Sequence, residues 1–193
     1  MILILGSNGL FGSYFKNFLN KRKLKYKTIG KKNCDINGNI LDYKFLKKSI
    51  NIIKPQCIIN LAAMTNIEKC EENKLLAKKL NIILPKNISV IINKKTFFIH
   101  FSTDHIYSKN FLQKENSKIK FLNYYAKSKY LGEKSINHRN KCILRTNFFG
   151  KSKSNRDSFT DWIFMSIKKK KKVFLYNDVF FSPLSMQSLS KYI

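Results

Sequence analysis

The chain has 193 residues, of which 44% are hydrophobic, so it is long enough for one domain with a sizeable core and too apolar for a disordered chain. No run approaches the roughly 18 consecutive apolar residues of a membrane-spanning helix, and we expect no membrane association. The formal net charge of +27 raises the alternative of a nucleic-acid-binding protein. We expect no nucleic-acid partner, because the charge is nearly all lysine and is spread over every segment, whereas base recognition relies on arginine.

The cysteines and the start of the chain bear on the cellular compartment. Cys34, Cys57, Cys70 and Cys142 are scattered and form no C-x-x-C pair, so we expect no metal site and a reducing environment. A strand pattern begins at Met1 and leaves no room for a signal peptide. These features favour a cytoplasmic protein.

Apolar runs alternate along the chain with segments of helical periodicity. We predict strands at 1–5, 26–29, 57–61, 96–101, 141–145 and 173–176. We predict helices at 10–19, 41–53, 73–92, 124–136 and 159–167, the third perturbed at Pro85. The strands are continuously apolar, which is typical of a parallel sheet covered on both faces. The sequence therefore predicts an α/β fold, a Rossmann-like doubly wound parallel sheet, as one NAD(P)-binding domain over residues 1–193.

A glycine-rich turn directly follows the first predicted strand. Gly6, Gly9 and Gly12 stand in the order G-x-x-G-x-x-G, a variant of the G-x-G-x-x-G dinucleotide fingerprint. Glycines permit a tight turn, a close approach of the backbone to a pyrophosphate and close packing of helix on sheet. The start of the following helix offers free N–H groups and a positive dipole end. We predict that this turn binds the phosphates of a dinucleotide.

The segment 30–36, after the second predicted strand, should meet the adenosine end of the dinucleotide. No acidic residue directly follows the strand to bind a ribose 2′-hydroxyl, and Lys31 and Lys32 stand there instead. Two cations suit a 2′-phosphate. The sequence therefore favours NADP(H) over NAD(H).

Tyr125 and Lys129 are four residues apart in a predicted helix and therefore share one face of it. An ammonium near a phenol favours the phenolate, so we expect the pKa of Tyr125 to be lowered toward neutrality, where it can act as a general acid or base. Lys129 can also hold the nicotinamide ribose. Thr103, at the end of the fourth predicted strand, can hydrogen-bond the substrate oxygen. The polar segment 108–122, which we predict to be a loop, lies where parallel strands bind ligands. This pattern indicates a nicotinamide-dependent enzyme that acts on an alcohol or a ketone.

Several blocks in order resemble the extended short-chain dehydrogenase/reductase family, and within it the dTDP-4-dehydrorhamnose reductases and related sugar-nucleotide reductases. The blocks are 4–12, 34–36, 58–73, 80–89, 98–108, 123–136, 143–150 and 177–183. The resemblance implies a catalytic trio of Thr103, Tyr125 and Lys129. It implies a set of cofactor-binding residues, which are Gly6, Asn8, Gly9, Leu10, Phe11, Gly12, Asp35, Ile36, Leu61, Ala62, Ala63, Thr65, Tyr125 and Lys129.

The same resemblance implies an activity. Hydride would pass from the nicotinamide to the 4-keto group of a nucleotide sugar, and Tyr125 would donate the proton. The family links such enzymes to deoxysugar and polysaccharide precursor biosynthesis, and it leaves a homodimer open.

Three features depart from the pattern of the resemblance. Related 4,6-dehydratases carry Asp-Glu after the threonine, whereas Asp104 is followed here by His105, which favours a plain reductase. We expect His105, as a lone histidine, to be structural. Phe148 stands where rhamnose reductases typically have tryptophan, so the sugar stays open. Family members run on for roughly another hundred residues, and we expect the chain to lack much of its C-terminal substrate-binding part.

Two alternatives share this scaffold. An epimerase of the same family would use the same trio and return the hydride, so it would not consume NADPH. A non-catalytic NAD(P)-binding regulatory subunit is the second, since some relatives are partners of methionine adenosyltransferase. The intact Thr103, Tyr125 and Lys129 favour catalysis.

Overall fold

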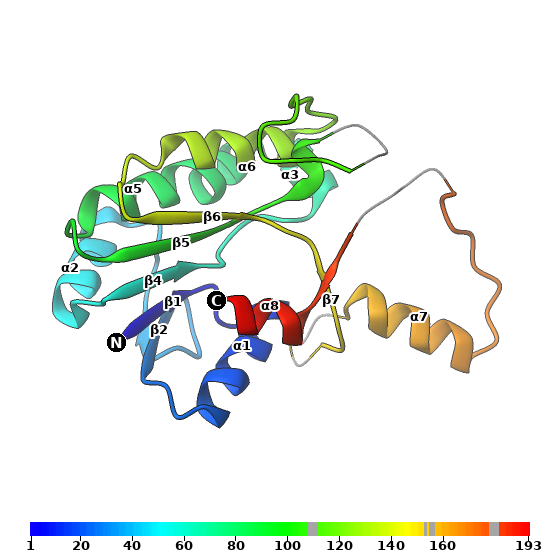
Figure 1. The fold of residues 1–193 in the computed structure, drawn as a ribbon, viewed down its shortest axis with the longest axis horizontal. Helices are drawn as coiled ribbons and strands as arrows, with labels where there is room; N and C mark the ends of the chain where they lie inside the picture. Colours follow the sequence, from blue (N-terminus) through cyan, green and yellow to red (C-terminus); the bar gives the residue numbers. More distant parts are fainter. Residues whose placement is uncertain (108–111, 153, 155–156, 178–181) are drawn as a thin grey trace.

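The computed structural model describes residues 1–107, 112–152, 154, 157–177 and 182–193. Six parallel strands form one sheet in the order β3-β2-β1-β4-β5-β6 (Figure 1). The strands are β1 (Ile2–Leu5), β2 (Tyr26–Gly30), β3 (Ile36–Asn37), β4 (Cys57–Asn60), β5 (Phe97–Ser102) and β6 (Lys141–Arg145). From β1 the chain adds β2 and β3 on one side of the sheet and then β4, β5 and β6 on the other, as in doubly wound dinucleotide folds. This strand order confirms the predicted α/β class.

Helices cover both faces of the sheet. The helices of the described residues are α1 (Leu10–Lys21), α2 (Tyr43–Ile53), α3 (Ile67–Glu72), α4 (Lys74–Lys78), the π-helix η1 (Lys79–Ile83), α5 (Leu84–Ile91), the 3₁₀ turn η2 (Asp104–Ile106), α6 (Tyr124–Ser135), α8 (Met186–Tyr192) and, apart from the sheet, α7 (Phe159–Lys168). Leu3 and Leu5 of β1 pack toward α2 and α5, whereas Ile4 packs toward α1 and α8. Each of these three strand residues is fully buried, which explains the continuous apolar run that predicted them.

One predicted strand is wrong and one strand of the sheet was not predicted, each for a physical reason. The run 173–176 is not a strand: it follows α7 away from the sheet, and Phe174 and Tyr176 are 88% and 85% exposed (Figure 1). An apolar run forms a strand only where a neighbouring strand can pair with it. The sixth strand of the sheet is instead β3, which has only two residues and too little pattern to be predicted.

The helix predicted at 73–92 is divided into α4, η1 and α5. The division precedes Pro85, which lies in the first turn of α5, where its missing N–H removes no helical hydrogen bond. The predicted loop 108–122 and the block 177–183 lie partly outside the described residues.

A second, two-stranded sheet joins the C-terminal part to the domain. β7 (Phe148–Phe149) pairs in parallel with β8 (Leu184–Ser185), and α8 follows directly. Met186 and Leu189 of α8 then pack into the core beside α1. α7 lies apart from the sheet with large apolar side chains exposed. Within the described ranges, no helix combines the length and the apolar character needed to cross a bilayer.

The π-turn of η1 seats α6 at close range. The side chain of Asn81, fully buried, donates to the carbonyl of Met64 (3.0 Å) and to Ser128 Oγ of α6 (2.9 Å). Gly132 faces the same segment, and a Cβ there would lie 2.0 Å from the carbonyl oxygen of Asn81. Only glycine permits this approach, so the position of α6 is fixed by backbone-to-backbone contact.

We expect Gly132→Ala to lower the free energy of unfolding by about 2–3 kcal/mol, because the methyl group would overlap a backbone oxygen. Helix propensity alone predicts the opposite sign, a gain of up to about 1 kcal/mol. Urea denaturation of the variant and of Lys127→Ala, an exposed position of the same helix, measures the difference. A Gly132→Ala protein as stable as the parent would contradict this account of the α6 contact.

Candidate active site

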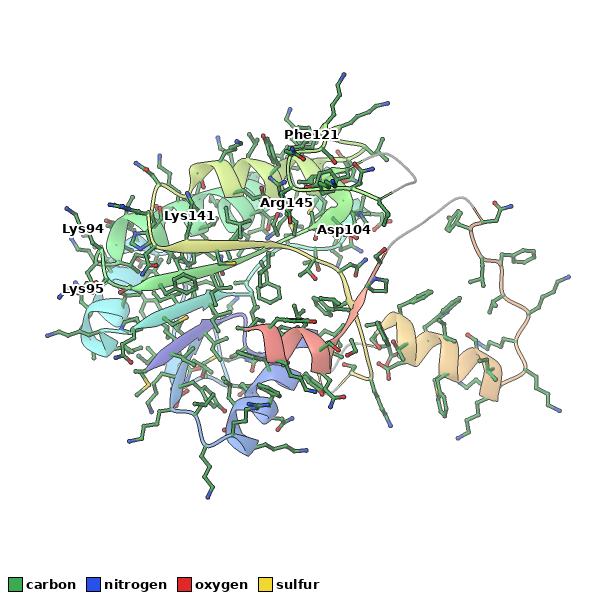
Figure 2. All side chains as sticks on the ribbon, in the orientation of Figure 1. Lys94, Lys95, Asp104, Phe121, Lys141 and Arg145 are labelled. Atoms are coloured by element: carbon green, nitrogen blue, oxygen red, sulfur yellow. The ribbon has the colours of Figure 1, made fainter. Side chains whose placement is uncertain are left out.

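The carboxyl ends of β1, β4, β5 and β6 open onto a cavity of about 470 Å³. Figure 2 shows Asp104 at this end of the sheet and Lys94 and Lys95 at the other. Most of the predicted site residues line the cavity, namely Gly6, Gly9, Leu10, Phe11, Gly12, Leu61, Ala63, Thr65, Thr103, Tyr125 and Lys129. The fold thus brings the glycine turn and the Thr-Tyr-Lys trio, which are far apart in sequence, to one place.

The glycine turn has the tight geometry that the spacing predicts. Gly6 has a positive φ of 79°, and a Cβ there would lie 2.6 Å from the backbone nitrogen of Ala62. A Cβ on Gly12 would lie 2.5 Å from the carbonyl oxygen of Gly6. Gly9 caps α1 without a side-chain acceptor, which leaves the N–H groups of the first helical turn for a ligand. These features fit a bound pyrophosphate.

Asn8 and Ala62 are not among the residues that line the cavity. The Asn8 amide donates to the carbonyl of Lys32 (2.8 Å) and accepts from Lys16 Nζ (3.2 Å). Asn8 therefore ties the glycine turn to the segment that follows β2. The backbone of Ala62 packs against Gly6.

Asp35 and Ile36 also lie outside the cavity lining. The carboxylate of Asp35 accepts from the backbone N–H (2.8 Å) and the hydroxyl (2.7 Å) of Thr28 and pairs with Lys27. Burial opposes ionisation, but the hydrogen bonds from Thr28 outweigh it and lower the pKa of Asp35. Asp35 thus joins β2 to β3, and a role beside adenine stays a prediction.

The Thr-Tyr-Lys trio comes from two elements that pack together. Thr103 directly follows β5, while Tyr125 and Lys129 lie on α6 and share a face. The start of α6 is held by its cap Asn123, whose side chain accepts from the Ala126 N–H (2.8 Å). The Thr103 hydroxyl is close enough to the Tyr125 phenol to counteract the effect of burial on the pKa of Tyr125. The phenol and the hydroxyl therefore already stand together at the cavity.

Lys129 is a buried cation, only 2% exposed. Its Nζ donates to the carbonyl of Phe101 on β5 at 2.5 Å. Burial lowers the pKa of Lys129 to about 8, an effect that the carboxylate of Glu133 opposes.

The predicted lowering of the Tyr125 pKa is wrong for this state of the site. Burial raises the pKa of Tyr125, the Thr103 hydroxyl opposes the rise, and Asp104 adds to it. The prediction assumed an ammonium directed at the phenol, whereas Lys129 Nζ is directed to the carbonyl of Phe101. Helical spacing brings the two residues to one face, but it does not determine where the flexible lysine points.

Several lining residues were not predicted as site residues. The ring of His105 is exposed at the cavity and meets Tyr125 edge-on, with ring centroids 5.9 Å apart, and the expectation of a structural histidine stays a prediction. Thr146, Asn147 and Phe148 follow β6 and also line the cavity. Their position after a parallel strand is a signal that could have identified them from sequence.

The sheet order and the glycine turn together define a Rossmann-like domain of the dinucleotide-binding type. Comparison with known proteins identifies its family. Residues 1–193 match the family described as RmlD substrate binding domain, and the chain belongs to this family.

Relatives of known name agree with this assignment. The dTDP-4-dehydrorhamnose reductase of Salmonella typhimurium is 26% identical over 158 residues, which cover 79% of this chain and 52% of the relative. Methionine adenosyltransferase 2 subunit beta of Xenopus laevis is 31% identical over 156 residues, covering 74% and 45%. The chain thus spans about half the length of the curated relatives it matches.

Solved structures share the fold. A hypothetical dTDP-4-dehydrorhamnose reductase from Sulfolobus tokodaii superposes with a TM-score of 0.84 at 28% identity. The match covers 98% of this chain and 69% of the Sulfolobus tokodaii chain. The Bacillus anthracis dTDP-4-dehydrorhamnose reductase, in complex with NADP, gives a TM-score of 0.87 at 24% identity, covering 99% and 68%.

We expect Lys129→Met to raise the free energy of unfolding of the cofactor-free protein over that of the wild type. This gain should be about 2 kcal/mol larger at pH 7 than at pH 10. The pKa of Lys129 is near 8 when folded, below its ordinary value of 10.5, so the folded state bears the full cost of the buried charge below pH 8. As pH rises from 8 to 10.5 that cost disappears, and with it the advantage of the variant. Denaturant unfolding at both pH values measures the change. Lys127→Met is the exposed control, and an advantage for Lys129→Met that is equal at pH 7 and pH 10 would contradict the prediction.

Proposed function

We propose that this chain binds NAD(P)H and reduces the 4-keto group of a nucleotide sugar, in the manner of a dTDP-4-dehydrorhamnose reductase. The observation that carries the proposal is the meeting of the glycine turn with Thr103, Tyr125 and Lys129 around one cavity. The names of the relatives support the same substrate class. Such a reaction supplies deoxysugar precursors for polysaccharides, and the proposed partners are the nucleotide sugar and a second copy in a homodimer.

The residues present fit a dinucleotide. Gly6, Gly9 and Gly12, with the start of α1, would hold the pyrophosphate, and Lys129 would hold the nicotinamide ribose. Bound NAD(P)H supplies the hydride. Lys31 and Lys32 are exposed, and the hydrogen bond from Asn8 to the Lys32 carbonyl holds their segment beside the glycine turn. Two cations in this position support a preference for NADP(H).

The trio supplies the proton and orients the ketone. Because the pKa of Tyr125 is raised, its phenol is protonated at neutral pH and is available as the donor. Thr103 hydrogen-bonds the substrate oxygen beside the phenol. As the carbonyl oxygen gains negative charge, the phenolic proton passes to it, giving an alcohol and a tyrosinate. The ammonium of Lys129, on the same face of α6, would turn from the Phe101 carbonyl toward the tyrosinate and stabilise it until it regains a proton from solvent.

A second candidate is a non-catalytic NAD(P)-binding regulatory subunit. It is favoured by the 31% identity to the methionine adenosyltransferase subunit beta, which exceeds the identity to the reductase of Salmonella typhimurium. An epimerase is a third. Net oxidation of NADPH in the presence of a 4-keto nucleotide sugar distinguishes the reductase from both.

We expect Tyr125→Phe to lower the rate of NADPH oxidation at least about a hundredfold, because the proton donor is lost. NADPH affinity should stay within about twofold of the parent, because the phosphates and ribose have other partners. Turnover assays and fluorescence titration give the two values, with Tyr130→Phe on the same helix as control. Loss of both properties together would indicate a folding defect or a wrong assignment.

We expect Gly9→Asp to abolish NADPH binding while the protein stays folded. Gly9 has ordinary extended torsion angles, and a Cβ there would meet only the Gly6 carbonyl at 3.3 Å, so a side chain requires that carbonyl to shift by a few tenths of an ångström. The carboxylate would then repel the pyrophosphate. Fluorescence titration with NADPH and NADH, using Gly9→Ala as the uncharged control, measures affinity and preference together. Unchanged affinity in the aspartate variant would exclude the glycine turn as the phosphate site.

A further inference from the structure

A buried carboxylate continues the face of α6 that carries the candidate catalytic residues. Tyr125, Lys129 and Glu133 follow at intervals of four residues, so all three lie on one side of the helix. Lys129 and Glu133 are 2% and 4% exposed. Their partners on β5 are consecutive: Lys129 Nζ donates to the Phe101 carbonyl, and Ser102 Oγ donates to Glu133. These two contacts hold α6 against β5 immediately before Thr103.

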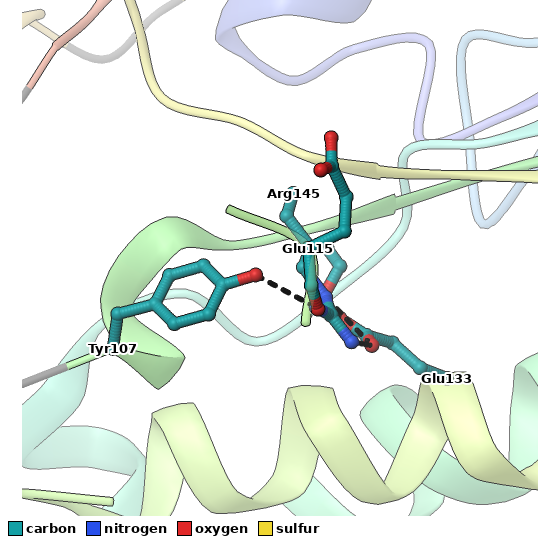
Figure 3. Close-up of polar contacts among 5 residues, drawn as sticks. Tyr107, Glu115, Glu133 and Arg145 are labelled. Atoms are coloured by element: carbon teal, nitrogen blue, oxygen red, sulfur yellow. Dashed lines mark hydrogen bonds and ion pairs between the residues drawn. The ribbon is translucent and has the colours of Figure 1, made fainter. Parts of the chain in front are cut away.

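Arg145 fixes the carboxylate of Glu133 from the neighbouring strand. The guanidinium donates from Nε to both carboxylate oxygens (3.2 and 3.0 Å) and from a terminal nitrogen at 2.8 Å. Its other terminal nitrogen donates to Tyr107 Oη (2.7 Å) and to the backbone carbonyl of Glu115 (2.8 Å), as Figure 3 shows. Hydrogen bonding to Glu133 raises the pKa of Arg145 further. A single ion pair, with Glu133 buried and Arg145 partly buried, therefore connects α6, β5, β6 and the segment that precedes α6.

We propose that Glu133 is a positioning residue of the reaction proposed above, whose carboxylate keeps the Lys129 ammonium charged and in register with Thr103 and Tyr125. The functional pattern is then Y-x-x-x-K-x-x-x-E. This inference rests on the proposed function for its role in turnover, but its electrostatic part concerns the cofactor-free chain and is measurable there.

The surroundings of Lys129 favour this assignment. Besides Tyr125 and Glu133 on its own helix, it faces Cys70 of α3 and His100 of β5. Burial, together with the charge of Lys129, lowers the pKa of His100 well below its ordinary value, so His100 is neutral. Its Nε2 has no hydrogen-bond partner among the described residues. Glu133 is the strongest of the groups that oppose the effect of burial on the pKa of Lys129, followed by Cys70.

The test is the titration of Lys129 in the cofactor-free protein, followed by NMR of ¹³Cε-labelled lysine, with the signal assigned by its loss in Lys129→Gln. We expect the wild-type lysine to titrate near pH 8. In Glu133→Gln, whose side chain keeps the shape but not the charge, the midpoint should fall by about one pH unit, a tenfold loss of proton affinity. Glu72→Gln, an exposed position on α3, should leave the midpoint unchanged. An unchanged midpoint in a folded Glu133→Gln protein would overturn the proposal.

A second variant covers the case in which Glu133→Gln does not fold. Glu133→Gln with Arg145→Met removes both members of the ion pair, so Arg145 is not left without its carboxylate, and such pairs are often replaced without loss of stability. Its Lys129 midpoint should again lie below that of the wild type, and an equal or higher midpoint would overturn the proposal.

Turnover distinguishes this proposal from the function on which it rests. If the wild type oxidises NADPH, the alkaline limb of its pH–rate profile should move to lower pH in Glu133→Gln and return toward the wild-type position in Glu133→Asp, which restores the charge. If the wild type shows no turnover but the Lys129 midpoint is lower in Glu133→Gln than in the wild type, the proposed reaction is refuted and the electrostatic role of Glu133 is supported. A turnover profile that does not move, with an unchanged midpoint, would refute the role of Glu133 alone.

Discussion

The burial of Lys129 between α6 and the carboxyl end of β5 is the constraint on which the site depends. A lone ammonium in this position would be strongly destabilising, and it is offset by the Phe101 carbonyl and by the charge of Glu133. Because Glu133 is itself held by Ser102 and Arg145, the cation requires α6, β5 and β6 to keep one arrangement. The same arrangement places Thr103 and Tyr125 together at the cavity.

Parallel strand order explains why distant sequence segments meet in one cavity. The carboxyl ends of β1, β4, β5 and β6 lie at one edge of the sheet, so the glycine turn after β1 faces the residues that follow β5 and β6. Gly6 lies against the backbone of Ala62 and Gly132 against that of Asn81, so these segments pack closer together than any side chain at the two glycines would allow. The buried Lys129 ammonium lowers the stability of the folded chain. Such a cost is typical of a functional site whose groups are positioned before the ligand binds.

Sequence patterns were sufficient where the physics is local or strongly periodic. The continuous apolar runs predicted the five longer strands of the sheet, and the glycine spacing predicted the turn at the start of α1. They were insufficient where the outcome depends on a partner: β3 is too short to show a pattern, and the run 173–176 has no adjacent strand. The direction of the Tyr125 pKa shift depends on where the Lys129 ammonium points, which spacing does not encode. Glu133 could have been predicted from the sequence, because it follows Lys129 by the same four residues that separate Lys129 from Tyr125.

The central claim is that this chain, which matches about half the length of the Salmonella typhimurium reductase, performs hydride transfer at the cavity shared by the glycine turn and the trio. The most direct measurement mixes the purified chain, saturated with NADPH, with a 4-keto nucleotide sugar and follows NADPH oxidation and sugar reduction together. We expect NADPH to be consumed in one-to-one proportion to the reduced sugar. Saturable NADPH binding without any oxidation would contradict the claim and would leave the binding subunit and the epimerase as the candidates.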